Sequence, residues 1–164
     1  MDPAEWPSVL NDHVRTDLVI RGPVQVDRDF AFPKTPNNRS FHCHYMFRPL
    51  VNGEKVKRSW LTYSKNNDSV YCFCCKLFSK KSLKLITEGQ QDWVNIGALL
   101  KLHDNSPDHV KNVLTWKELE LSLRKGKTRR NRVVPSGGRE EEVERGAYSV
   151  GFHHPVSSRE EPGT

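Results

Sequence analysis

The sequence is short of the residues that build a large hydrophobic core. Only 35% of its 164 residues are hydrophobic and 9% are aromatic. A chain of this length holds one modest domain, and the low apolar content excludes a core that extends through all of it. We therefore expect irregular flanks and a bound staple, such as a metal ion, that supplies part of the folding free energy.

Long apolar runs are missing as well. No stretch approaches the roughly 20 consecutive apolar residues that a transmembrane helix needs. The first six residues, MDPAEW, lack the basic and apolar regions of a signal peptide. The sequence thus predicts an intracellular protein with no membrane partner.

Cysteine is scarce, with four residues, but its placement is informative. Cys72, Cys74 and Cys75 lie together, too close in sequence to bridge one another readily. In a reducing compartment, a cluster of this kind indicates metal binding rather than disulfides.

Basic residues exceed acidic residues by 26 to 20, which gives a net charge of +6. A positive balance of this size favours contact with polyanions such as DNA, although charge alone does not establish it because many basic proteins bind none.

Composition divides the chain into three segments. Residues 1–38 carry five of the ten prolines and predict an N-terminal arm that is extended or disordered, with at most a short turn or strand at 14–20. Residues 39–123 carry the apolar periodicity of a folded domain. Residues 124–164 have six basic residues between 124 and 132, then a run of glutamates, and predict a disordered basic and acidic tail.

The first half of the domain segment has the pattern of strands. Alternation of apolar and polar residues predicts strands over 40–47, 56–63 and 69–74. Asn52-Gly53 and residues 65–68 are the turns between them.

The second half has the pattern of helices. Apolar residues at three- and four-residue spacings predict helices over 93–103 and 107–123. Ser106 is a good N-cap for the second helix, and Pro107 suits its first position. The predicted fold class is α+β, a small zinc-stabilised finger in which a β knuckle is followed by helices.

Two residue pairs have the spacing of zinc ligands. Cys72 and Cys75 form a C-x2-C pair, and His103 and His109 enclose five residues. We predict that these four side chains hold one structural Zn²⁺, because a filled tetrahedral shell leaves no position for an activated water. The less favoured alternative is a set of packed cysteines beside ordinary surface histidines.

Two other groups stay outside this predicted ligand set. Strand alternation would point Cys74 away from the neighbouring cysteines. Cys43, His42 and His44 form a second His/Cys group, but a strand with two histidines on its polar face accounts for them better.

Four lysines surround the cysteine knuckle, residues 72–75, and aromatic residues lie between them in the sequence. These lysines are Lys76, Lys80, Lys81 and Lys84. They suit either contact with phosphates and bases or a solvated face over a small aromatic core, and the sequence favours neither. The basic run at 124–132 suits nuclear import, loose phosphate binding or a plain charged linker.

An ordered set of motifs resembles a known family. They are Asp2-Pro3-Ala4-Glu5-Trp6-Pro7, Arg21-Gly22-Pro23, Arg39-Ser40-Phe41, Arg58-Ser59-Trp60-Leu61-Thr62-Tyr63-Ser64, Tyr71-Cys72-Phe73-Cys74-Cys75-Lys76-Leu77-Phe78, Gly89, Asp92-Trp93 and His103-Asp104-Asn105-Ser106-Pro107-Asp108-His109. Together, over about residues 1–123, they look like the TTF-type zinc finger of hAT-family transposases and of transposase-derived zinc finger MYM-type protein 1-like proteins.

The resemblance implies a BED-like finger that binds DNA, with Cys72, Cys75, His103 and His109 as the ligands. Family members continue into a catalytic domain with three acidic residues, and residues 124–164 do not resemble that continuation. We therefore expect a zinc-dependent DNA-binding module in the nucleus, without transposase activity. A zinc-dependent protein-interaction module is the alternative, and an enzyme with a cysteine nucleophile is strongly disfavoured.

Overall fold

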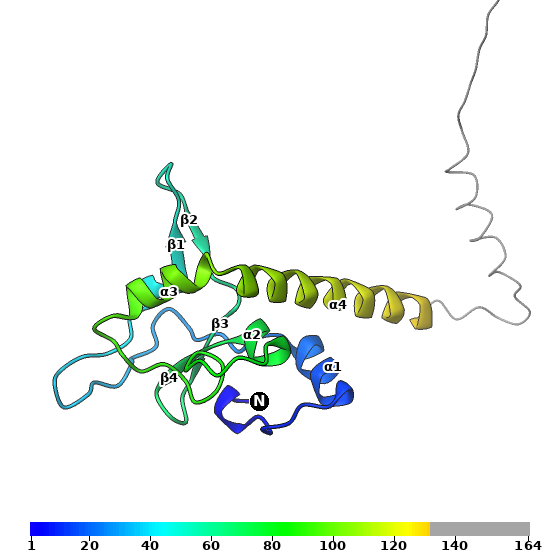
Figure 1. Cartoon of the computed structure of the whole chain (residues 1–164), viewed down its shortest axis with the longest axis horizontal. Coiled ribbons are helices and arrows are strands. Elements are labelled where there is room, and N and C mark those ends of the chain that lie inside the picture. The colour runs from blue at the N-terminus through cyan, green and yellow to red at the C-terminus, as the bar shows by residue number, and fades with distance from the viewer. Residues whose placement is uncertain (132–164) are drawn as a thin grey trace, which may run out of the picture. The chain divides into compact units, whose positions relative to one another are not determined.

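The computed structural model describes the backbone of residues 1–131 and the side chains of residues 1–126. Met1–Lys125 form one compact unit, which holds the core and the candidate site. Of the second unit, from Gly126 on, only the end of the last helix is described. The predicted α+β class is confirmed (Figure 1). In chain order the elements are η1 (Pro3–Glu5), α1 (Asp12–Arg21), η2 (Cys43–Met46), β1 (Phe47–Pro49), β2 (Lys55–Lys57), β3 (Leu61–Ser64), β4 (Ser69–Cys72), α2 (Phe73–Phe78), α3 (Ile96–Asp104) and α4 (Pro107–Asn131).

The strands of this unit form two separate antiparallel hairpins. β1 pairs with β2, with Arg48 opposite Val56, and β3 pairs with β4, with Leu61 opposite Cys72. The turn predicted at Asn52-Gly53 is confirmed: Gly53 has a φ of 90°, and its N–H donates to the carbonyl of Leu50 at 3.0 Å. A positive φ of this kind favours glycine.

The strands are shorter than the alternation predicted. Half of 40–47 is a 3-10 helix, η2, and only the last residue of the range enters β1. The predicted strand 56–63 is split by a turn in which the N–H of Leu61 donates to the carbonyl of Arg58 at 3.0 Å. Arg58 is buried in an ion pair with Asp104. A buried charge is strongly destabilising without its partner, so the backbone turns here to place Arg58 beside Asp104, and the strand is interrupted.

Both predicted helices are present. α3 begins at Ile96, three residues later than predicted, because Trp93 packs in the core ahead of the helix. α4 begins at Pro107 as predicted, and Ser106 caps it by accepting a hydrogen bond from the His109 N–H at 3.5 Å. The helix continues to Asn131, past the predicted end at 123; the remainder of the predicted tail, 132–164, lies outside the described residues.

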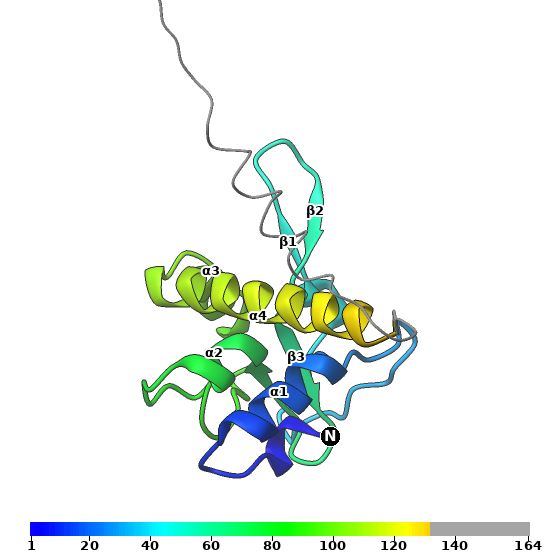
Figure 2. The ribbon, with the colours of Figure 1, turned by 90° about the vertical axis from the view of Figure 1, so that its right-hand side faces the viewer.

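The N-terminal segment differs from the expected extended or disordered arm. Residues 14–20, expected as a turn or strand, belong to helix α1, whose Leu18 and Val19 are buried in the core. Figure 2 shows α1 beside α2, and the Nε of Arg15 donates to the carbonyl of Leu77 at 3.0 Å. The prolines lie outside this helix, so the segment folds where they permit and buries apolar surface.

Aromatic rings build the centre of the unit. Phe73, from α2, contacts both Trp6 and Trp116, with ring centroids 5.6 and 5.1 Å apart, and all three rings are buried. The N-terminal segment, the cysteine knuckle and α4 therefore share one core, and the knuckle is held from both sides.

None of the helices within residues 1–131 combines the length and the apolar content that a transmembrane span requires.

Candidate metal centre

Three elements bring a group of metal-ligating side chains together. Cys72 is the last residue of β4, and Cys74 and Cys75 lie in α2, which follows directly. His109 lies in the first turn of α4. The three sulfurs and one ring nitrogen of His109 all lie within 4.8 Å of one another, and all four side chains are buried.

The distances fit a tetrahedral zinc site. His109 Nδ1 lies 3.4 Å from Cys72 Sγ and 3.5 Å from Cys75 Sγ. Zn–S bonds of about 2.3 Å and Zn–N bonds of about 2.0 Å at a tetrahedral angle place sulfur and nitrogen roughly 3.5 Å apart. The side chains are therefore already spaced as ligands of one ion, and the soft thiolate and imidazole donor set is typical of zinc.

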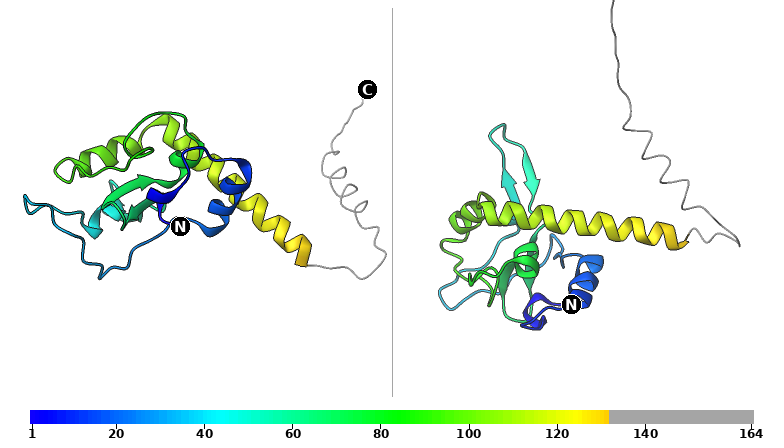
Figure 3. Two further views of the ribbon diagram at one scale, coloured as in Figure 1. Left: turned by 90° about the horizontal axis from the view of Figure 1, so that it is seen from below. Right: turned by 45° about the vertical axis from the view of Figure 1, so that its right-hand side comes forward.

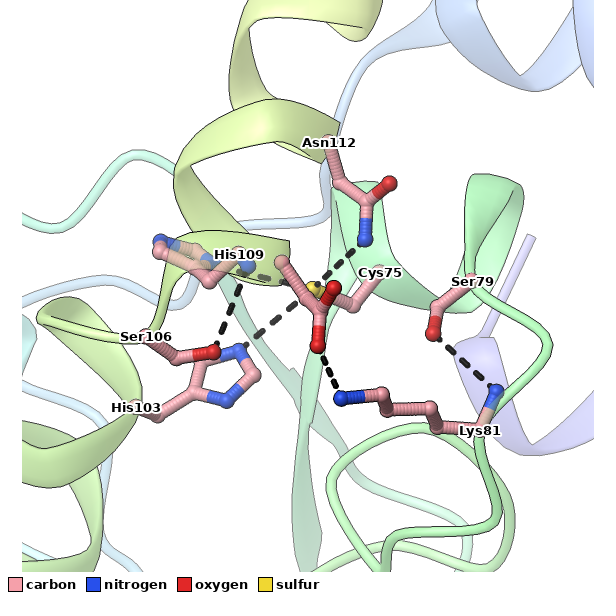
Figure 4. Close-up of polar contacts among 8 residues, drawn as sticks. Cys75, Ser79, Lys81, His103, Ser106, His109 and Asn112 are labelled. Carbon is pink, nitrogen blue, oxygen red and sulfur yellow. Dashed lines mark hydrogen bonds and ion pairs between the residues drawn. The ribbon is translucent and has the colours of Figure 1, made fainter.

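His103 approaches the same group from the end of α3. Its Nε2 lies 3.5 Å from Cys75 Sγ, and its ring centroid is 4.4 Å from that of His109. Figure 4 shows His103 and His109 converging on the sulfur of Cys75 from different helices. The structure thus brings together all four predicted ligands, although His103 is not one of the four whose donor atoms all lie within 4.8 Å.

Cys74, which strand alternation left out of the site, lies in the cluster. Its Sγ is 3.5 Å from Cys72 Sγ and 3.8 Å from His109 Nδ1. The alternation argument was wrong for two reasons: residues 72 and 74 of a strand share one face, and β4 ends at Cys72, where a helix begins at Phe73. In a helix, successive residues turn by about 100° instead of alternating between two faces, so both Cys74 and Cys75 can turn toward Cys72.

A second layer of contacts orients these ligands. The amide Nδ2 of Asn112, one turn after His109 on α4, donates to Cys75 Sγ at 3.4 Å (Figure 4). The indole of Trp60 packs against both imidazoles, with ring centroids 5.2 Å from His103 and 4.6 Å from His109. Hydrogen bonds of this kind fix ligand geometry and tune the charge on the thiolate.

The cysteines differ in acidity because their surroundings differ. Burial raises the pKa of the Cys72 thiol. Hydrogen bonds from Cys72 and Cys74, with smaller contributions from the two histidines, hold the pKa of Cys75 well below its usual range. Cys75 is therefore more readily deprotonated than Cys72, and a bound Zn²⁺ would favour the thiolate form of its other cysteine ligands.

The other His/Cys group consists of His42, Cys43 and His44. In the described part of the chain, these side chains do not converge on one point as metal ligands would. Cys43 Sγ contacts the carbonyl of Arg28 at 3.4 Å, and the rings of His42 and His44 stack on each other at 5.7 Å. The non-metal interpretation of this group stays a prediction, and the expected strand is wrong, because the segment is a 3-10 helix.

The four knuckle lysines lie in different environments. Lys76 is half-buried, and its ammonium donates to the carbonyls of Ile86 and Thr87 at 3.1 and 3.2 Å. Lys81 forms an ion pair with Asp108, drawn in Figure 4. Lys80 and Lys84 are exposed.

Comparison with known proteins agrees with a zinc site. The chain is 43% identical over 127 residues to zinc finger MYM-type protein 5 of Homo sapiens, and 40% identical over 124 residues to the protein of that name from Mus musculus. These alignments cover 77% and 75% of this chain but 19% and 20% of the relatives, so the chain spans about a fifth of their length. No family model and no solved structure matches the chain. Over three quarters of its length the chain is thus similar to zinc finger MYM-type protein 5, and its buried cysteine and histidine cluster is a zinc site.

Proposed function

We propose that the chain is a DNA-binding module whose fold depends on one structural zinc ion and that has no catalytic activity of its own. The observation that carries this proposal is the buried cysteine and histidine cluster, which joins β4, α2 and α4. A metal at this junction stabilises a unit that has few hydrophobic residues, and the basic side chains exposed elsewhere on that unit can then contact a polyanion.

Within this proposal the ligands are Cys72, Cys75, His103 and His109. Five donors surround four tetrahedral positions, so one side chain is left out. A buried neutral thiol costs little free energy, because free cysteine behaves as a small hydrophobe. A buried imidazole without a partner costs more, and the 3.5 Å between His103 Nε2 and Cys75 Sγ matches a tetrahedral edge. Cys74 is therefore the donor that remains a thiol, and a Cys3His shell with Cys74 in place of His103 is the alternative.

The absence of catalysis follows from the filled shell. A catalytic zinc keeps one position open for water or substrate, and here protein side chains supply all four. A thiol nucleophile is the remaining chemical possibility, and it is tested by thiol titration. Zinc-bound thiolates should be protected in the holo protein and become reactive after chelation, whereas a nucleophile would react in both forms.

DNA is the favoured partner because of charge. The chain carries a net charge of +6, and its exposed lysines lie in the same compact unit as the metal centre. The experiment is a binding titration of the full zinc-loaded chain with a random-sequence DNA duplex at low and high salt. We expect binding that weakens steeply with salt and is lost on chelation.

A protein-interaction module is the second candidate. Val110 and Leu114 of α4 are exposed apolar side chains, 48% and 59% accessible, and such positions favour contact with another protein. Absence of DNA binding at every salt concentration would favour this second function.

Origin and location are part of the same proposal. The ordered motifs of residues 1–123 support descent from the TTF-type finger of a hAT-family transposase, and the basic run at 124–132 supports import into the nucleus. A fluorescent fusion of the whole chain should be nuclear. It should become cytoplasmic when the basic residues of the run are replaced by glutamine.

A further inference from the structure

The β1–β2 hairpin is a two-stranded ribbon that stands out from the rest of its unit (Figures 1 and 3). Within residues 1–131 its strands pair only with each other, and Val51 at its tip is fully exposed. The tip is nevertheless ordered, because the Leu50 N–H donates to the carbonyl of Glu54 at 2.7 Å and the Glu54 N–H donates to Asn52 Oδ1 at 3.0 Å. An ordered projection with a fully exposed tip calls for an explanation outside the hairpin itself.

The base of this ribbon is held rigidly. The guanidinium of Arg58 donates from Nη1 to the carbonyls of Tyr45 and Phe47 at 2.8 and 2.7 Å, and from Nε to Asp104 Oδ2 at 2.9 Å. The ribbon is therefore fixed to the end of α3. A rigid projection loses little conformational entropy on binding, which favours a role in recognition.

The ribbon is basic. Lys55 and Lys57 of β2 are exposed and share one face, since they are two residues apart in a strand. Arg48 of β1 pairs with the residue between them, and Glu54 is the one acidic residue from 47 to 57. Burial, followed by the charges of His42 and Lys55, lowers the pKa of nearby His44, so this imidazole adds no positive charge at neutral pH.

The charge continues from the ribbon onto α3. A groove of about 660 Å³ between them is lined by Lys55, Arg48, Lys101 and the ring of Tyr45, among others. The acidic residue in this groove, Asp104, is already neutralised by Arg58. Both walls of the groove therefore present basic groups that have no acidic partner in the described part of the chain.

The cysteine knuckle offers less free charge. Lys76 and Lys81 are engaged by backbone carbonyls and by Asp108. Lys84 lines a hollow with Glu88 and Asp92. Of the two basic surfaces, the ribbon thus has the larger share of positive charge that no acidic group or carbonyl engages in the described residues.

We propose that the β1–β2 hairpin is the element that contacts duplex DNA, with Lys55 and Lys57 on the phosphates of one groove wall and Lys101 extending the contact from α3. This inference rests on the proposed DNA-binding function. A two-stranded β ribbon fits the major groove of B-DNA, which is about 12 Å wide. Basic side chains that contact the phosphates fix its register on the duplex.

The test compares two matched double variants of the full zinc-loaded chain. K55Q/K57Q removes two exposed charges from the ribbon, and K80Q/K84Q removes two exposed charges from the knuckle. Affinity for a random-sequence DNA duplex is measured by fluorescence anisotropy across a salt series, and zinc per chain is measured for every protein. K55R/K57R keeps the ribbon charge and serves as the rescue.

We expect K55Q/K57Q to bind roughly 10- to 100-fold more weakly near 0.1 M salt, with a salt slope shallower by about 1.8, because each phosphate contact contributes about 0.9 to the slope. K80Q/K84Q and K55R/K57R should bind with nearly the wild-type affinity, and all variants should keep their zinc. If the ribbon variant binds like the wild type while the wild type binds DNA, the ribbon inference is overturned and the DNA-binding function stands. If the wild type binds no DNA at any salt concentration, the proposed function itself fails.

Discussion

Arg58 and Asp104 form a buried ion pair that ties the β1–β2 hairpin to the end of α3. Nη2 and Nε of Arg58 lie 2.8 and 2.9 Å from the same carboxylate oxygen, and the two side chains are only 7% and 4% exposed. Asp104 follows His103 directly, so the pair also holds the backbone that carries this histidine. One interaction therefore connects the projecting ribbon to the metal centre.

Breaking this pair should be costly. Arg58→Met leaves the carboxylate of Asp104 buried and uncompensated, and we expect it to lower the free energy of unfolding by about 3–5 kcal/mol. Denaturant titration of the zinc-loaded protein measures the change. Asp17→Asn, which removes an exposed pair with Arg21, is the control and should cost less than about 1 kcal/mol. Equal losses in the two variants would contradict the structural role assigned to Arg58.

Zinc binding should depend on Cys75 and not on Cys43. Cys75→Ser removes the sulfur on which both histidines and Asn112 converge, so we expect less than one zinc per chain and loss of secondary structure. Cys43→Ser, at a half-buried cysteine outside the cluster, should keep both. Elemental analysis and circular dichroism give the two readouts. A Cys75→Ser protein that retains stoichiometric zinc would refute the site.

The fourth ligand can be identified by substituting cobalt for zinc. With two thiolates and two imidazoles, Cys74→Ala should leave the sulfur-to-metal charge-transfer absorption of the Co²⁺ protein unchanged, whereas His103→Ala should change the d–d bands and weaken binding. With three thiolates the pattern reverses, and Cys74→Ala lowers the charge-transfer intensity by about a third. The reversed pattern would replace His103 by Cys74 in the ligand set.

Asn112 should support metal affinity without being a ligand. Asn112→Leu keeps the volume but removes the donor to Cys75 Sγ, and we expect zinc affinity to fall roughly 10- to 100-fold. Competition with a chelator of known affinity measures this. Thr115→Ala, on the same helix, removes a hydroxyl that donates to the carbonyl of Lys111 and should leave the affinity unchanged. An unaltered affinity for Asn112→Leu would mean that this hydrogen bond does not act on the metal.

Gly89 should tolerate no side chain. Its φ is 94°, and a Cβ there would lie 2.6 Å from the Cβ of Ser69 and 2.9 Å from the ring of Tyr71. Gly53 also has a positive φ, of 90°, but a Cβ there meets nothing within 4 Å. We expect Gly89→Ala to destabilise the protein by about 1–3 kcal/mol more than Gly53→Ala, because overpacking adds to the shared backbone strain. Thermal denaturation of the two variants side by side should show this difference, and equal melting temperatures would contradict it.

The sequence by itself determined the chemistry of the centre and the places of α3 and α4, but not those of α1 and α2. The spacings of Cys72, Cys75, His103 and His109 were sufficient to predict zinc, because ligand identity and spacing are local properties of the chain. The cap at Ser106 and the turn at Asn52-Gly53 were predictable for the same reason.

Only the tertiary structure decided which donors meet and which surface is free. Cys74 enters the cluster because β4 ends at Cys72 and a helix follows. Arg58 interrupts the predicted strand because it pairs with Asp104, which is 46 residues away and could not be identified from the local sequence. The free charge of the ribbon follows in the same way, since the groups that engage Lys76 and Lys81 lie 10 and 27 residues further along the chain. Alternation and charge counts treat each residue in its local context, whereas burial and pairing depend on neighbours that the fold brings from elsewhere in the chain.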